Sequence, residues 1–154
     1  MSMGIVSNVE IRELRDGDVV GGKRVKNVVT SGGLTAIRDF LYAGGDFAGP
    51  PIYVAYGSGT IAVGRFDTIV PGETFRTPIV ARDKSGLSVI YHWFVKKNDN
   101  ANQTVGAYAL VGGAATLTPN SGTVYAIVNE PTPFSKDATT TYSGDWTLTV
   151  SGVY

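Results

Sequence analysis

The apolar segments of this 154-residue chain are short, and almost every one is bounded by glycine, proline, asparagine or aspartate. These residues favour turns because glycine supplies positive φ, proline lacks a backbone donor, and Asx side chains bond the local backbone. Short apolar runs separated by turn signals are typical of all-β proteins. We therefore predict a mainly β, single-domain β-sandwich or jelly-roll-like fold, with no linker long enough to divide it.

The strand candidates are distributed along the whole chain. We expect strands at residues 9–13, 19–20, 25–30, 52–56, 74–82, 88–97, 104–111, 123–128 and 146–150. Asp16-Gly17-Asp18 is a tight-turn signal between the first two. Residues 1–30 are therefore expected to form an extended N-terminal arm or hairpin, and residues 31–154 the sandwich domain.

The segment 88–97 is apolar on both of its faces. One face carries Val89, Tyr91, Trp93 and Val95, and the other carries Ile90, His92 and Phe94. A strand with two apolar faces is either central in a sandwich or has one face at a subunit contact.

One helix is expected at about residues 33–43. Leu34, Ile37, Phe40 and Leu41 recur at helical spacing, Ser31 is a candidate N-cap, and Gly44-Gly45 is a stop signal. At roughly three turns, this helix is long enough to cover one end of a sheet.

The charge and composition exclude several classes of function. Thirteen basic residues balance 13 acidic ones, which argues against a nucleic-acid partner, and no apolar segment predicts a membrane partner. Without cysteine there is no disulfide framework, thiolate metal site or cysteine nucleophile, and a single histidine excludes sites that need two imidazoles. We expect no metal and no cofactor.

Two segments resemble catalytic or cofactor motifs, but their sequence context does not support chemistry. Residues 57–62 satisfy the dinucleotide pattern G-x-G-x-x-G/A, but no helix signal follows to place its N-terminus at a pyrophosphate. His92 lies within a predicted strand, where we expect it to be packed with one ring nitrogen bonded. Most carboxylates lie beside turn residues. The sequence therefore predicts no catalytic residue and no enzyme.

The order of several short segments is informative. In chain order these are Asn27-Val28-Val29-Thr30, Gly33-Leu34-Thr35-Ala36-Ile37, the strand and turn at residues 53–60, Asp67-Thr68, Glu73-Thr74-Phe75-Arg76, residues 122–126, Phe134-Ser135-Lys136 and the final strand at 146–150. From about Asn27 to the C-terminus this order resembles the N-terminal domain of tailed-bacteriophage tail-collar fibre proteins.

The resemblance implies a non-enzymatic structural component of a virion, made in the host cytoplasm. It would be a tail or fibre-attachment protein or a capsid decoration protein, in contact with other virion proteins and with copies of itself as a trimer or hexamer. The contacts between copies are expected on the arm, at Val9, Ile11, Val19, Val20 and Val25.

The alternative is a carbohydrate- or receptor-binding module that recognises a host-surface glycan. Such a module needs exposed aromatic side chains around a groove. The candidates are Tyr42, Tyr53, Tyr56 and Tyr142.

Overall fold

The computed structural model describes residues 2–43, 49–59, 64 and 66–153, and these form nine strands and one helix. The strands are β1 (Ser2–Arg15), β2 (Asp18–Lys26), β3 (Val28–Val29), β4 (Pro51–Gly57), β5 (Glu73–Ser85), β6 (Ser88–Val95), β7 (Thr104–Gly112), β8 (Thr123–Ser135) and β9 (Thr141–Val153), and the helix is α1 (Ser31–Ala43). The predicted mainly β fold with one short helix is confirmed.

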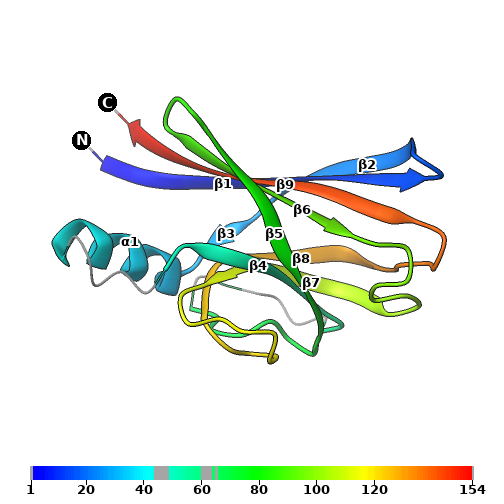
Figure 1. Ribbon diagram of the computed structural model, residues 1–154. Coiled ribbons are helices and arrows are strands. Elements are labelled where there is room, and N and C mark those ends of the chain that lie inside the picture. Colours follow the sequence, from blue (N-terminus) through cyan, green and yellow to red (C-terminus); the bar gives the residue numbers. More distant parts are fainter. Residues whose placement is uncertain (1, 44–48, 60–63, 65, 154) are drawn as a thin grey trace.

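The strands form one curled antiparallel sheet in the order β2-β1-β9-β6-β5-β4-β7-β8-β3. Strand β5 belongs to both layers: Phe75 to Pro78 pair with β4, and Ile79 to Ser85 pair with β6. The sheet therefore folds over at β5 into two layers (Figure 1). We call β2, β1, β9, β6 and the second half of β5 the upper layer, and the remaining strands the lower layer.

Residues 1–30 contribute a hairpin that is built into the upper layer. Its turn places Asp16 at φ 51° and Gly17 at φ 87°, the positive values that a tight two-residue hairpin turn requires. Strand β1 pairs with β2 on one side and, from Ser2 to Leu14, with β9 on the other. Both sides of β1 are thus occupied within the chain.

Two tryptophans fill the core between the layers. Trp93 of β6 and Trp146 of β9 are fully buried, with ring centroids 6.1 Å apart. Each indole N–H has a partner: Trp93 donates to the Tyr56 hydroxyl at 2.7 Å, and Trp146 donates to Ser7 Oγ at 2.9 Å. A Cβ at Gly144 would lie 2.1 Å from Trp93 Cζ2, so the indole needs glycine at this position.

The lower layer is buried on its second face as well. Ala55, Ala107 and Ala109 form an apolar cluster there with Val70, from the segment that precedes β5. A Cβ at Gly106 would lie 2.2 Å from the carbonyl oxygen of Gly59, so small residues let this segment approach closely. The second covering segment, residues 113–122, is anchored by the ion pair described below.

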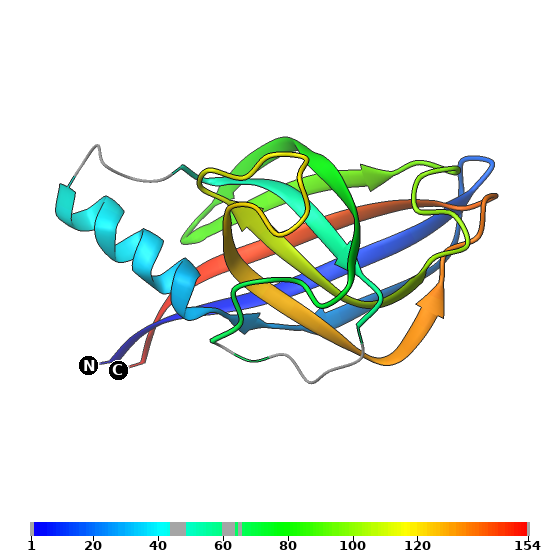
Figure 2. The ribbon, with the colours of Figure 1, turned by 90° about the horizontal axis from the view of Figure 1, so that it is seen from below.

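Helix α1 begins earlier than predicted. Gly33 N donates to Thr30 Oγ1 at 3.1 Å, and Leu34 N donates to Thr30 O at 3.0 Å, so Thr30 is the N-cap and Ser31 is already helical. Thr30 suits this role because its backbone is held against Tyr125 O at 3.0 Å. The predicted stop, Gly44-Gly45, lies outside the described residues. The helix packs on β8 and projects beyond the strands of the lower layer (Figure 2).

Several strands extend beyond their predicted bounds. Strand β5 continues to Ser85, β8 to Ser135, and β9 begins at Thr141. The added residues are mostly polar because they lie on the outside of the sheet or, like Pro131 and Pro133, are exposed on a strand near the sheet edge. Apolar periodicity does not detect such residues.

Candidate functional site

A row of six charged side chains crosses the outside of the upper layer. In order from β2 to β5 they are Arg24, Glu10, Arg12, Asp145, His92 and Asp83. Glu10, Asp145 and His92 occupy directly paired positions on three neighbouring strands, so sheet register brings them together. We call this set the charged row.

Each member of the charged row contacts the next. Arg24 donates through Nε and Nη2 to Glu10 Oε2, both at 3.1 Å, and Arg12 Nη1 lies 3.3 Å from Glu10 Oε1. Arg12 Nη2 donates to Asp145 Oδ2 at 2.9 Å. The signs therefore alternate from one end of the row to the other.

His92 is held by carboxylates at both ring nitrogens. Nδ1 lies 2.6 Å from Asp145 Oδ1, and Nε2 lies 2.8 Å from Asp83 Oδ2. Two carboxylates require two N–H donors, which makes this histidine an imidazolium. The hydrogen bond with Asp145, followed by the one with Asp83, raises the pKa of His92 above its ordinary value.

The pKa values of Asp145 and Arg12 also shift in the direction that favours their charged forms. Burial alone would raise the pKa of Asp145, but hydrogen bonds from His92 and Arg12 outweigh it and lower that pKa. The hydrogen bond to Asp145 also raises the pKa of Arg12. The contacts among Arg12, Asp145 and His92 therefore stabilise the charged forms of these three groups.

The charged row is suited to electrostatic contact more than to proton transfer. Both nitrogens of His92 are engaged, so neither is free to accept a proton from a substrate in this arrangement. From the sequence we expected one bonded nitrogen, and neither carboxylate was evident, because strand pairing brings Asp145 from 53 positions away and Asp83 from 9 positions away.

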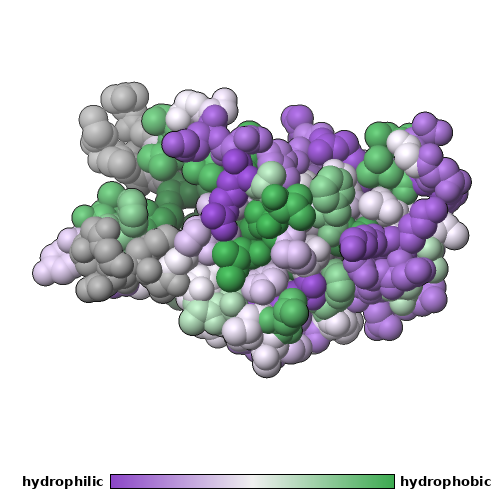
Figure 3. Space-filling model, viewed as in Figure 1, coloured by the Kyte–Doolittle hydropathy of each residue, from purple (hydrophilic) through white to green (hydrophobic). Residues whose placement is uncertain are grey.

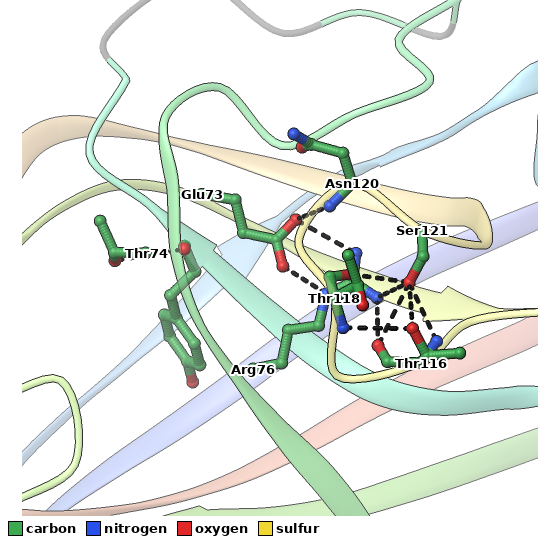
Figure 4. A network of polar contacts seen from close by, with 8 residues as sticks. Glu73, Thr74, Arg76, Thr116, Thr118, Asn120 and Ser121 are labelled. Carbon is green, nitrogen blue, oxygen red and sulfur yellow. Dashed lines mark hydrogen bonds and ion pairs between the residues drawn. The ribbon is translucent and has the colours of Figure 1, made fainter.

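A second polar centre lies in the lower layer and anchors the segment 113–122 (Figure 4). The side chains of Glu73 and Arg76 are almost fully buried and form a two-point ion pair, in which Arg76 Nε donates to Oε1 and Nη2 donates to Oε2 at 3.1 Å. Arg76 Nη1 donates to Thr116 O at 2.9 Å and to Ser121 Oγ at 3.0 Å. Asn120 N donates to Glu73 Oε2 at 2.8 Å.

A hollow of about 210 Å³ lies beside this ion pair, between β5 and the side chains of Leu117 and Pro119. Because Glu73 neutralises Arg76 and both groups already have partners in the covering segment, they offer no unpaired charge to a ligand. We interpret this centre as a structural anchor.

Lys136 ties two loops together at the far end of the sandwich. Its side chain is buried, and Nζ donates to Lys97 O at 2.7 Å and to Asp137 O at 3.1 Å. Burial lowers the pKa of Lys136 below its ordinary value. Hydrogen bonds from Thr139 and Thr140 hold the pKa of the neighbouring Asp137 carboxyl at about 2.

The five residues predicted to contact other copies fall into two groups. Val9 and Ile11 are buried, and Val25 packs partly buried against the same core. Val19 and Val20 are exposed on β2, next to the hairpin turn. The inward residues of the hairpin serve the chain's own core, and only the two valines by the turn are open to a neighbour.

The four aromatic candidates do not lie around a common groove. Tyr42 is exposed near the end of α1, and Tyr53 is partly buried against the lower layer. Tyr56 and Tyr142 are buried, and burial raises the pKa of Tyr142 to about 12. Alternation along the strands turns the last two toward the core.

The glycine-rich segment 57–62 lies only partly within the described residues. Gly57 ends β4, and Ser58 N and Gly59 N donate to Gly72 O and Pro71 O, both at 3.0 Å. The first half of the pattern is thus bonded to the segment that leads into β5, and residues 60–62 lie outside the described residues.

Comparison with known proteins adds no family to this description: no family model, curated protein or solved structure matches the chain. Within the described part of the chain, no three of its His, Asp and Glu side chains group as a metal site would require. None of the helical residues described forms a helix long and apolar enough to cross a membrane. The fold and site define a mainly β protein with a charged sheet face.

Proposed function

We propose that this chain is a non-enzymatic structural component of a tailed-phage virion that acts through contacts with copies of itself and with neighbouring virion proteins. The order of segments from Asn27 to the C-terminus supports the phage setting, as does the mainly β fold. The tail or fibre-attachment role and the capsid decoration role share this mode of action.

Exposed apolar side chains at one end of the molecule carry the proposal. Leu41 and Tyr42 of α1 are 76% and 92% exposed, and Leu87 and Val150 are 71% and 41% exposed. The end of α1, the β5–β6 turn and the end of β9, which carry these residues, lie at the end of the molecule where both termini are found (Figure 1). The same end shows apolar side chains on its surface (Figure 3). Exposed apolar groups concentrated in this way mark protein–protein contact.

The backbone ties part of this apolar end together. Val150 N donates to Leu87 O at 3.1 Å, which joins the end of β9 to the β5–β6 turn. The apolar groups of these two elements are therefore presented at a fixed spacing to a neighbour.

The test is the mass of the full chain by sedimentation equilibrium, with the double variant L41S/Y42S. We expect the natural chain to form a trimer or hexamer. The double variant should have a higher dissociation constant, so that it is monomeric at concentrations where the natural chain is still assembled. Thr35→Ser, at an exposed position of the same helix, is the matched control. A natural chain that stays monomeric at every concentration would contradict self-association.

The glycan-binding alternative has one supporting observation, the exposed ring of Tyr42. A single ring offers one stacking surface, whereas recognition of a sugar chain uses several. The apolar end therefore favours protein contact over glycan contact.

A further inference from the structure

The order of signs along the charged row suits a contact with a second, reversed copy of the same row. Across the strands its signs run plus, minus, plus, minus, plus, minus, so its two ends, Arg24 and Asp83, are opposite in charge. The row spans five strands, from β2 to β5, so its middle lies on β9 beside Asp145. Reversing the row about β9 brings Arg24 opposite Asp83 and Glu10 opposite His92, so opposite signs meet at these four positions.

We propose that the outer face of the upper layer binds the same face of a second copy of this chain, about a two-fold axis parallel to the strands through the middle of the charged row. The proposal rests on the proposed function in requiring self-association. The operation pairs Arg24 with Asp83 and Glu10 with His92, and each pairing occurs twice, while Arg12 and Asp145 of both copies lie near the axis.

The residues at the two ends of the row are accessible to a partner. The side chain of Arg24 is 80% exposed and that of Asp83 is 71% exposed, whereas His92 and Asp145 in the middle are about three-quarters covered. Arg24 and Asp83 can therefore reach across to a partner while the middle of the row keeps its own contacts.

Apolar and small side chains complete the outer face. Ile90 and Phe94 flank His92 at two-residue spacing, so they point to the same side as His92, and Phe94 is half exposed. On β9, Thr147 and Ser143 flank Asp145 in the same way. Short side chains between apolar ones leave a sheet face that another sheet can approach to about 10 Å.

A second copy fits this face better than other partners. The row has three positive and three negative groups, so a nucleic acid or a uniformly charged protein would gain at three positions and lose at three. A second copy carries both members of the Arg24–Asp83 and Glu10–His92 pairings, and the strand order places the members of each pairing the same number of strands from β9. Charges at the rim set the orientation of such a contact, and the apolar groups supply affinity.

The proposal limits the symmetry of the oligomer. A two-fold contact is compatible with a dimer or with a hexamer of three pairs. A cyclic trimer contains no such contact, and a trimer without larger species in solution would overturn this proposal while leaving the proposed function intact.

Charge reversal at the ends of the row provides the test. Arg24→Asp and Asp83→Lys each turn two attractive contacts per pair into repulsive ones, so we expect the dissociation constant of each variant to rise about tenfold at low salt. A mixture of the two variants restores both pairings, because in a mixed pair each acidic side chain at either end of the row faces a basic one. The mixture should therefore associate with nearly the natural affinity.

Lys97→Asp is the matched control, because Lys97 forms an exposed ion pair with Asp16 at 3.2 Å and lies outside the row. Circular dichroism of each variant establishes that it is folded. If the single variants associate as the natural chain does, or if their mixture gains nothing, the two-fold contact is overturned and self-association uses another surface. If the natural chain is monomeric, both this proposal and self-association fail.

Discussion

Nδ1 of His92 lies 2.6 Å from Oδ1 of Asp145, on the outside of a sheet whose other side buries Trp93 and Trp146. One strand pairing produces both arrangements, because β6 and β9 alternate between a core face and an outer face. The core residues stabilise the fold, and the outer residues give the molecule a charged surface.

Stability should fall as pH rises through the titration of His92. The folded chain raises the pKa of His92, whereas the unfolded value is about 6.5. The stabilising contribution is therefore complete below about pH 6.5 and is lost as pH rises through the folded pKa. Urea unfolding of the natural chain between pH 6 and 9 measures this loss.

His92→Gln is the control for that experiment, because the chain has one histidine. The variant should show little pH dependence over the same range. The same slope in both proteins would contradict the assignment.

Asp145 contributes to stability at the acidic end of the pH scale. The folded chain lowers its pKa, so its stabilising contribution is present above about pH 4 and is lost as pH falls further.

Glu73→Gln should reduce the free energy of unfolding by about 3 kcal/mol, because it leaves the buried Arg76 without its counter-charge. Glu10→Gln removes a carboxylate from a more exposed part of the charged row and should cost less than about 1 kcal/mol. Urea unfolding at neutral pH compares the two. Equal losses would contradict the anchoring role of Glu73.

Gly144→Ala should destabilise the chain by about 3 kcal/mol, since the added methyl group meets the ring of Trp93 inside a closed core. Gly4→Ala is the matched control, because the nearest atom to a Cβ there is Ser151 Oγ at 3.7 Å. Thermal unfolding followed by tryptophan fluorescence measures both. An unaffected Gly144→Ala variant would show that the indole can move aside.

Thr30→Val should lower stability by about 1 kcal/mol or more, because it removes the hydroxyl that caps α1 and bonds Val124 O. Ser31→Ala should have a much smaller effect, since Ser31 is inside the helix. The reverse order of effects in urea unfolding would restore Ser31 as the cap.

The fold class could be predicted because turn residues and short apolar runs report local structure. Strand β6 was recognisable from its alternation, and the Asp16-Gly17 turn from residues that accept positive φ. The extra residues of β9 escaped prediction because their outward side chains are polar, as in Ser143 and Asp145.

The charged row could not be predicted, because it depends on which strands are neighbours. Asp145 and His92 meet only when β9 lies beside β6, and no local pattern in the sequence specifies that order. The Glu73–Arg76 pair had a signal, since both residues belong to the segment quoted for the phage resemblance. The sequence did not indicate that both side chains are buried.

We propose that this chain is a structural part of a virus particle, and cryo-electron microscopy of purified particles is the experiment that tests this role. We expect repeated density on the tail or capsid surface that fits the curled nine-strand sheet and α1. Particles that lack this density, and from which mass spectrometry recovers no peptide of the chain, would show that the chain is not a virion component.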